Sequence, residues 1–171
     1  MSANGNTNSP LLDIRNLRIE GLSEQGWHEI VCGVDLQLKR GEVLGLIGES
    51  GAGKSTIGLA AMGFARDGCR ITGGDIIFDG MELRTASEEQ KRQFRGTRIA
   101  YVAQSASAAL NPRILIGKQL IEGLLVHGIM EEAEGYKRII EQMELLQLPN
   151  PEEMTKRYPY QVSGGQRQRV M

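Results

Sequence analysis

The sequence predicts an α/β fold in which a glycine-rich loop joins a strand to a helix. The run GESGAGKST at 48–56 has the spacing G-x-x-x-x-G-K-[ST]. It follows a short apolar segment, 43–47, and precedes a stretch, 54–64, whose apolar residues recur on one helical face. Alternating segments come before this unit, and a block with helical periodicity, 113–157, comes after it. We therefore predict strands, a strand–loop–helix unit and then an inserted helical block.

The composition is that of an average globular protein. The 171 residues carry 20 Lys and Arg against 21 Asp and Glu, with a net charge of −1, so no global basic field favours nucleic acid or anionic lipid. No apolar stretch approaches the roughly 18 residues that a spanning helix needs. We therefore expect no nucleic-acid partner and no direct membrane span. The 22 glycines are in excess and gather in short clusters, which predicts loops where backbone approaches a ligand or partner closely.

Neither the N-terminus nor the cysteines indicate an exported protein. Residues 1–10, MSANGNTNSP, lack the basic start and apolar middle of a signal peptide, and we predict a disordered tail of a cytosolic protein. Cys32 and Cys69 stand alone, without the spacing of a disulfide framework or a zinc site. We expect two reduced thiols.

Three strands are predicted before the glycine-rich loop. Apolar residues alternate with polar ones over 12–19 and again over 30–38, which is typical of half-buried strands in a hairpin. The run VLGLI at 43–47 is apolar throughout, which predicts a strand that is covered on both faces. The helix over 54–64 is weakened by its internal glycines.

Further elements follow the loop and its helix. Turn signals bound a predicted strand at 73–81, and Ser87 opens a charged helix to residue 94 with Gln90 in the capping-box position. A short strand is predicted over 98–103. The helical block over 113–157 ends at a group of prolines, and a further helix begins after Ser163.

The loop at 48–56 has the chemistry of a phosphate-binding site. Its glycines let backbone N–H groups turn inward around a phosphate chain, and the helix that follows adds partial positive charge. Lys54 supplies a mobile charge to the terminal phosphates, and the Ser55 hydroxyl is a magnesium ligand. The alternative is a plain glycine-rich turn. The candidate nucleotide-binding residues are Gly48, Glu49, Ser50, Gly51, Ala52, Gly53, Lys54, Ser55 and Thr56.

Two further features narrow the type of nucleotide-binding protein. Ser163, Gly164, Gly165 and Gln166 open a helix and form a second anion-binding start, although in isolation an ordinary turn and cap fits them too. Gln104 ends a predicted core strand, where parallel sheets place their ligands, although a solvated glutamine is the simpler interpretation.

Together and in this order, the motifs resemble the ATP-binding subunit of ABC transporters. The loop is similar to the Walker A loop, Gln104 to the Q-loop glutamine, and YPYQVSGGQRQRVM at 158–171 to the ABC signature and its helix. Leu110-Asn111-Pro112 and Tyr158-Pro159 resemble the dipeptide and oligopeptide importer branch.

The resemblance implies a P-loop NTPase fold of the ABC ATPase type. It implies a partial RecA-like core at 41–69 and 96–104, an antiparallel β-subdomain at 11–40 and 70–84, a helical subdomain at 105–162, and the start of the signature helix at 163–171.

It also implies ATP and Mg²⁺ as ligands, with Ser55 and Gln104 at the magnesium ion. Residues 163–166 would face ATP that is held by a second ABC ATPase subunit, and residues 105–162 would dock on an integral membrane permease. The expected function is ATP-driven import, with peptides as cargo, from the inner face of the cell membrane.

Two departures from the family pattern concern the signature and the adenine contact. Val162 replaces the usual leucine of the signature. Where the family stacks an aromatic residue on adenine, this chain has Gly21 and Leu22. Trp27 in the same connection could substitute by stacking on the base, or it could simply pack the hairpin.

A third departure is that the chain stops at Met171, whereas the family places Walker B, the D-loop and the switch histidine after the signature helix. His28 and His127 precede the signature and do not match the switch histidine. We therefore expect a C-terminally truncated ATPase subunit that binds ATP, lacks catalytic residues of its own and does not hydrolyse ATP alone.

Two other functions compete with an importer subunit, and a third is compatible with it. A soluble ABC-type protein in DNA repair or translation shares the motifs, but no basic stripe with interleaved aromatics is visible. A small-molecule kinase with a chance SGGQ would be indifferent to mutation of Ser163. A non-catalytic fragment could retain only the binding of nucleotide or of a partner.

Overall fold

The computed structural model describes residues 9–171, apart from the side chains of residues 107 and 108. The disordered tail predicted for residues 1–10 therefore lies almost wholly outside the described part of the chain. The chain forms two units, Met1–Ile99 and Ala100–Met171.

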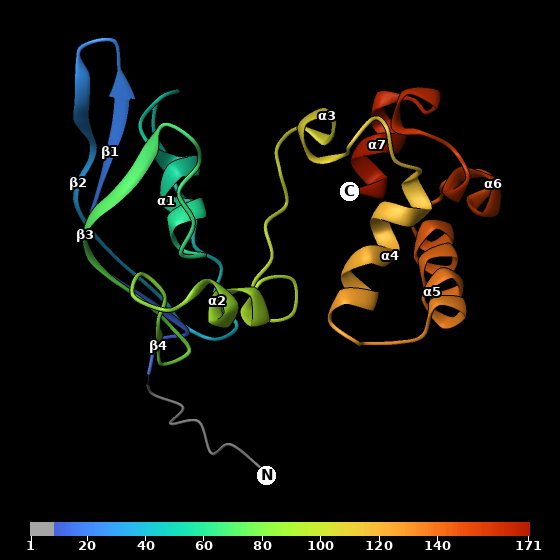
Figure 1. Ribbon diagram of the computed structural model, residues 1–171, viewed down its shortest axis with the longest axis horizontal. Helices are drawn as coiled ribbons and strands as arrows, with labels where there is room; N and C mark the ends of the chain where they lie inside the picture. Colours follow the sequence, from blue (N-terminus) through green and yellow to red (C-terminus); the bar gives the residue numbers. More distant parts are fainter. Residues whose placement is uncertain (1–8) are drawn as a thin grey trace. The chain divides into compact units, whose positions relative to one another are not determined.

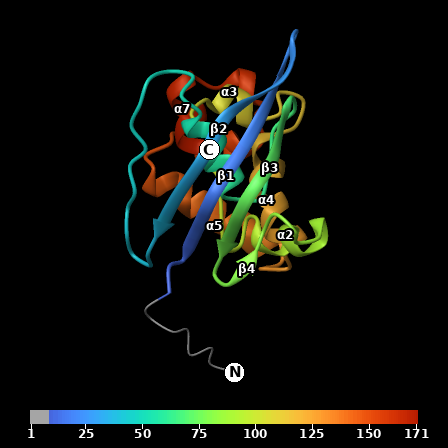
Figure 2. The ribbon, with the colours of Figure 1, turned by 90° about the vertical axis from the view of Figure 1, so that its left-hand side faces the viewer.

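The first unit is built on a four-stranded antiparallel sheet in the order β2-β1-β3-β4 (Figures 1 and 2). The strands are β1 Leu12–Ser23, β2 Gly26–Leu38, β3 Cys69–Phe78 and β4 Met81–Glu82. The alternation predicted over 12–19 and 30–38 is confirmed as a hairpin, which extends beyond both predicted segments to a turn at residues 24–25.

The two faces of the sheet differ in chemistry. The inner face packs on helices α1, Lys54–Ala60, and α2, Glu88–Phe94, and Figure 1 shows α1 beside this face. The fully buried side chains of the inner face are Ile14, Leu17, Ile19 and Ile76. The outer face carries cross-strand ion pairs, which suit a solvated surface. These are Arg18 with Glu29 at 2.7 Å and Arg70 with Glu20 at 2.6 Å.

A β-bulge in β2 shifts the register near the hairpin turn. Ile19 pairs with Val31, but the next residue, Glu20, pairs with Glu29, so Ile30 is an extra residue in β2. Ile30 and Val31 both pack toward the core of the first unit. From Glu29 to the turn, the alternation of faces along β2 is therefore reversed.

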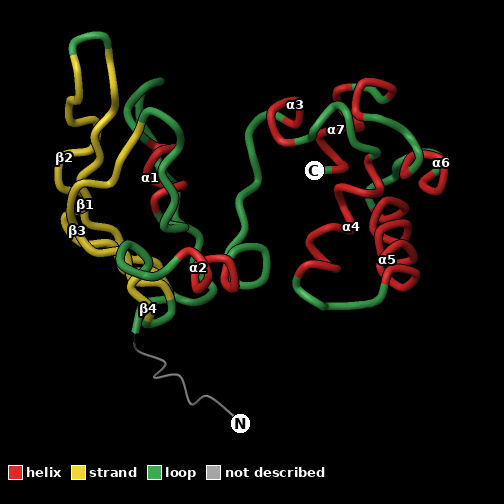
Figure 3. The backbone as a smooth tube through the Cα atoms, in the orientation of Figure 1, coloured by secondary structure: helices red, strands yellow, loops and turns green. Residues whose placement is uncertain are grey.

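The strands predicted at 43–47 and 98–103 are wrong, because both segments are loop in the structure (Figure 3). Val43 is 96% exposed and Ile47 is 99% exposed. A strand needs a neighbour to which its backbone can hydrogen-bond, and no described segment pairs with either stretch beyond an isolated bridge between Arg95 and Ile99.

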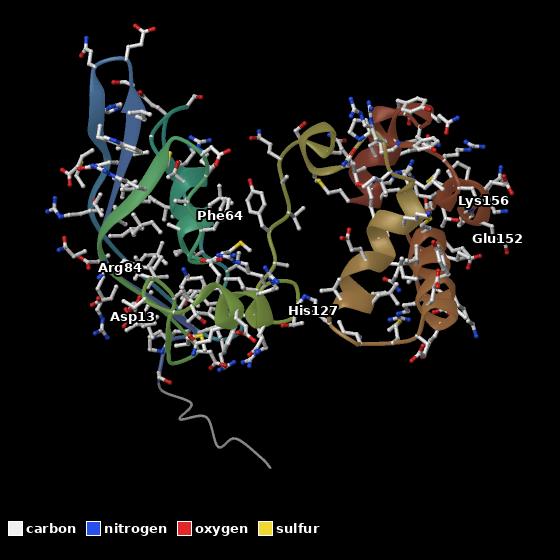
Figure 4. All side chains as sticks on the ribbon, in the orientation of Figure 1. Asp13, Phe64, Arg84, His127, Glu152 and Lys156 are labelled. Atoms are coloured by element: carbon white, nitrogen blue, oxygen red, sulfur yellow. The ribbon has the colours of Figure 1, made fainter. Side chains whose placement is uncertain are left out.

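The first-unit helices follow local sequence signals. The N-terminus of α2 is confirmed, since the Ser87 Oγ accepts from the Gln90 N–H at 3.2 Å and the Gln90 side chain accepts from the Ser87 N–H at 3.0 Å. Helix α1 is shorter than the predicted 54–64. Gly63 adopts a left-handed φ of 63°, which turns the chain away from the helix axis before Phe64. Figure 4 labels Phe64, which lies beside α1.

We expect Gly74→Ala to destabilise the first unit by about 3 kcal/mol, because backbone rather than a flexible side chain blocks the added methyl group. Gly74 has φ 87°, and its Cβ would collide with the carbonyl oxygens of Arg15 and Asn16. Gly80→Ala is the matched control, with φ 82° and nothing within 4 Å. It should cost only about 1 kcal/mol. Pulse proteolysis in urea measures both, and equal losses would show that steric overlap is not the cause.

The second unit is entirely helical. It contains α3 Ala106–Ala109, α4 Ile116–Val126, α5 Glu132–Leu145, α6 Pro151–Thr155, a 3₁₀ turn Pro159–Gln161 and α7 Gly164–Val170. The helical block predicted over 113–157 is confirmed as α4, α5 and α6. Its core is formed by Ile116, Ile121, Met143 and Met154, among others. Glu152, in the first turn of α6, and Lys156, which follows the helix, are exposed on the surface of this unit (Figure 4). Among the described residues, no helix combines the length and apolarity of a membrane span.

Candidate functional site

The glycine-rich loop ends against strand β2. Gly53 is the N-cap of α1 and has a left-handed φ of 82°, and its carbonyl accepts the Ile57 N–H at 2.9 Å. A Cβ on Gly53 would lie 3.3 Å from Val31 Cγ2 and 3.4 Å from the Ile30 carbonyl oxygen. The left-handed φ of Gly53 and its close approach to β2 both favour glycine over any residue with a side chain. This explains the glycine that precedes the lysine in the G-x-x-x-x-G-K-[ST] pattern.

Lys54 closes the loop upon itself. Its ammonium donates to the carbonyl oxygen of Gly48 at 2.7 Å and to that of Glu49 at 2.5 Å. The Ala52 N–H also donates to the Glu49 carbonyl, at 3.2 Å. The lysine charge is thus held on the loop backbone, where it can exchange carbonyl oxygens for phosphate oxygens without a change in the fold of α1.

The loop fits a polyphosphate group with a divalent cation. Gly51 is left-handed at φ 87°, the backbone from 48 to 52 is exposed, and Ser55 is exposed in the first turn of α1. A phosphate chain would meet N–H donors and the Lys54 ammonium. Among the described residues no three His, Cys, Asp or Glu side chains gather as a metal site. The exposed Ser55 hydroxyl is the ligand that the first turn of α1 offers to a cation.

The segment at 163–166 forms a capped but open helix start. The Ser163 Oγ accepts from the Gln166 N–H at 3.2 Å, and the Gln166 side chain accepts from the Ser163 N–H at 2.8 Å. Gly164 and Gly165 have no left-handed φ, and nothing lies within 4 Å of where their Cβ atoms would be. The described chain itself does not require glycine at either position, which favours close approach by a group outside it.

Arg169 anchors this helix, a role that the sequence reasoning missed. Its Nη1 donates to the carbonyl oxygens of Leu146 and Gln147, at 3.1 and 3.0 Å. These carbonyls lie at the C-terminal end of α5, where a cation is favoured by the helix dipole. The only signal in the sequence was the pair of arginines in QRQR at 166–169, and this pattern does not indicate which groups Arg169 would contact.

Gln104 is exposed in the loop before α3 and belongs to the second unit, as do residues 163–166. Residues 48–56 belong to the first unit. A magnesium site that combines Ser55 with Gln104 therefore stays a prediction.

Trp27 lies on the outer face of the sheet. It pairs with Leu22, and the Arg70 guanidinium lies 4.2 Å from the centre of its ring. Arg70 in turn pairs with Glu20 across the strands of that face. The structure thus gives Trp27 a cation–π partner, and the adenine contact predicted for it stays a prediction.

A loop of this geometry, joined to a helix through a left-handed glycine and closed by a lysine, defines a P-loop nucleotide-binding protein. A sequence profile described as ABC transporter matches residues 31–171. The chain belongs to the ABC transporter family and contains sequence of its ATP-binding domain. The resemblance drawn from the motifs is therefore confirmed.

Curated relatives agree with this assignment. The chain is 36% identical over 94% of its length to a probable peptide ABC transporter ATP-binding protein, y4tR, of Sinorhizobium fredii. It is 35% identical over 94% of its length to the oligopeptide transport ATP-binding protein OppD of Escherichia coli. It is 42% identical over 83% of its length to the metal-staphylopine import system ATP-binding protein CntD of Staphylococcus aureus. It spans about half of each relative, 48%, 48% and 52%.

Solved structures confirm the fold class. The ATP-binding cassette MJ0796, solved as a dimer with ADP and Pi, superposes with a TM-score of 0.78 at 24% identity. The match covers 93% of this chain and 66% of the cassette. An ATP-binding subunit of an ABC transporter superposes with a TM-score of 0.67 over 94% of this chain and 59% of its own.

Proposed function

We propose that this chain is the ATP-binding, energy-coupling part of an importer for peptides. The observation that carries the proposal is the loop at 48–56, in which left-handed glycines and the Lys54 ammonium form a candidate phosphate-binding site. The relatives named as peptide and oligopeptide proteins support the cargo class. The relative named for metal-staphylopine import shows that similar chains also serve other cargo.

ATP with Mg²⁺ supplies a phosphoanhydride bond whose cleavage releases free energy. The residues of this chain bind and orient that group. Backbone N–H groups near Gly51 and Gly53 would donate to phosphate oxygens, and Lys54 would exchange its two carbonyl oxygens for oxygens of the terminal phosphates. The Ser55 hydroxyl and Gln104 would be the ligands that the chain gives to the cation.

The second unit makes the contacts with partners in this proposal. Residues 105–162 dock on a membrane permease, at the cytoplasmic face of the membrane. Residues 163–166 act on ATP that is bound by a second ATPase subunit. The glycines at 164 and 165 support this, because no described atom lies within 4 Å of where their Cβ atoms would be, which leaves space for a phosphate to approach the backbone.

The chain by itself binds ATP and does not hydrolyse it in this proposal. Hydrolysis needs a carboxylate at the magnesium ion and another group to orient water. Glu49 is the only carboxylate of the loop at 48–56. The alternative is a non-transport ABC-type protein, which would copurify with no permease.

Action in trans can be tested in a full-length relative. We expect variants equivalent to Lys54→Ala and Ser163→Arg to be inactive separately and to recover partial ATPase activity when mixed. In a mixed dimer, the Ser163→Arg subunit supplies an intact loop and the Lys54→Ala subunit supplies an intact signature. Together they form one complete ATP site. The control is each variant mixed with itself, measured by phosphate release. Absence of recovery in the mixture would contradict action on a partner's nucleotide.

A further inference from the structure

We propose that the imidazole of His28, and not the indole of Trp27, contacts the base of the nucleotide. This inference rests on the proposed function, because it presumes that the phosphates are seated at 48–56. It assigns a role to a residue of the sheet that the motifs do not indicate.

The strand register decides which ring faces the loop. Residues directly opposite in an antiparallel ladder share a face of the sheet. His28 pairs with Gly21, and Trp27 pairs with Leu22. A Cβ on Gly21 would point at Ile30, 3.3 Å from its Cγ2. Ile30 packs toward the inner core, so Gly21 and His28 lie on the inner face.

Trp27 lies on the opposite face by the same criterion. The Arg70 guanidinium covers its ring at 4.2 Å, and Arg70 pairs with Glu20 on the outer face. The bulge at Ile30 causes this reversal, because without the extra residue Trp27 and Val31 would share a face. A base that extends from the loop along the inner face would therefore meet His28 before it could reach Trp27.

The loop lies at the end of α1 that is nearer the hairpin turn. Gly53 approaches β2 at Ile30 and Val31, whereas Gly63, beyond the other end of the helix, approaches Leu83. From Val31 to His28 the strand rises by about 7–10 Å. A ribose and the base attached to it can together extend that far from a phosphate at the loop.

The two residues of this cross-strand pair differ in exposure. Gly21 is buried under the Ile30 side chain, whereas His28 is exposed and its ring is accessible from solvent. In the part of the chain that the structure describes, the His28 side chain has no hydrogen-bond or ion-pair partner, whereas Trp27 has Arg70. The imidazole is therefore free to stack on adenine or to bond to its edge.

The test compares MgATP with magnesium tripolyphosphate, which has no base, by calorimetric titration. All proteins compared are the 171-residue chain with Val43→Lys and Ile47→Lys, which oppose pairing of the exposed apolar segment 43–47 between copies. We expect His28→Ala to weaken ATP binding about tenfold and to leave tripolyphosphate binding unchanged, since alanine removes only the contact with the base. His28→Phe should retain most of the ATP affinity. Glu29→Gln, the adjacent outer-face residue, is the control and should bind both ligands like the wild type.

Three outcomes would overturn the assignment. If Trp27→Ala weakens ATP binding while His28→Ala does not, the base lies on the outer face. If His28→Ala weakens both ligands equally, its effect acts through the loop and not through the base. If His28→Ala changes neither affinity, it makes no base contact. Absence of ATP and tripolyphosphate binding by the wild type would instead refute the proposed function itself, and the inference with it.

Discussion

Lys54→Ala is expected to weaken MgATP binding by tenfold to a hundredfold. The ammonium is the loop's mobile cation, and a charge-assisted hydrogen bond to phosphate contributes about 1.5–3 kcal/mol. The substitution also removes the two bonds from Nζ to Gly48 and Glu49, which hold the loop closed in the structure. Tripolyphosphate binding should fall by a similar factor, because the lost contact is with the phosphates.

The matched control for this experiment is Lys156→Ala. Lys156, the residue after α6, is exposed and pairs with Glu153 of that helix at 3.1 Å, so its loss changes the net charge equally without touching the loop. Calorimetric titration compares the MgATP affinity of the three proteins, each of which also carries Val43→Lys and Ile47→Lys to oppose aggregation. Equal affinity in wild type and Lys54→Ala would refute phosphate binding at 48–56, and an equal loss in Lys156→Ala would attribute the effect to net charge.

The isolated chain is expected to aggregate and to show no ATP turnover. The segment at 43–47 is apolar, and Val43 and Ile47 are almost fully exposed, at 96% and 99%. It has no strand partner in the described residues, so its backbone is available to pair with another copy. We expect elution as aggregate or in complex with another protein, and phosphate release equal to that of Lys54→Ala.

The double variant Val43→Lys, Ile47→Lys tests the cause of the aggregation. It should raise the monomer fraction several-fold in size-exclusion chromatography, because charges oppose edge-to-edge pairing. Val126→Lys is the matched control, since Val126 is 66% exposed on a helix whose backbone is already bonded. A monomeric wild-type chain, or one with turnover above the Lys54→Ala background, would contradict the prediction.

Local features of the site could be predicted from the sequence. The glycines of 48–56, the capping box at Ser87 and the helix start at Ser163 all follow from torsion preferences and hydrogen bonds within a few residues. Such interactions form wherever the same short sequence occurs, so their spacing alone was sufficient. The family followed from the order of the motifs, because several short patterns together are far more specific than any one.

Non-local pairing decided the rest. The apolar run at 43–47 has every local property of a buried strand, yet it is loop, because a strand exists only where another backbone bonds to it. The bulge at Ile30 arises from the register between β1 and β2, and it places His28 and Trp27 on opposite faces from those that simple alternation from Val31 would give. Only the tertiary structure could assign those faces, because the side-chain period of a strand is two and one extra residue reverses it.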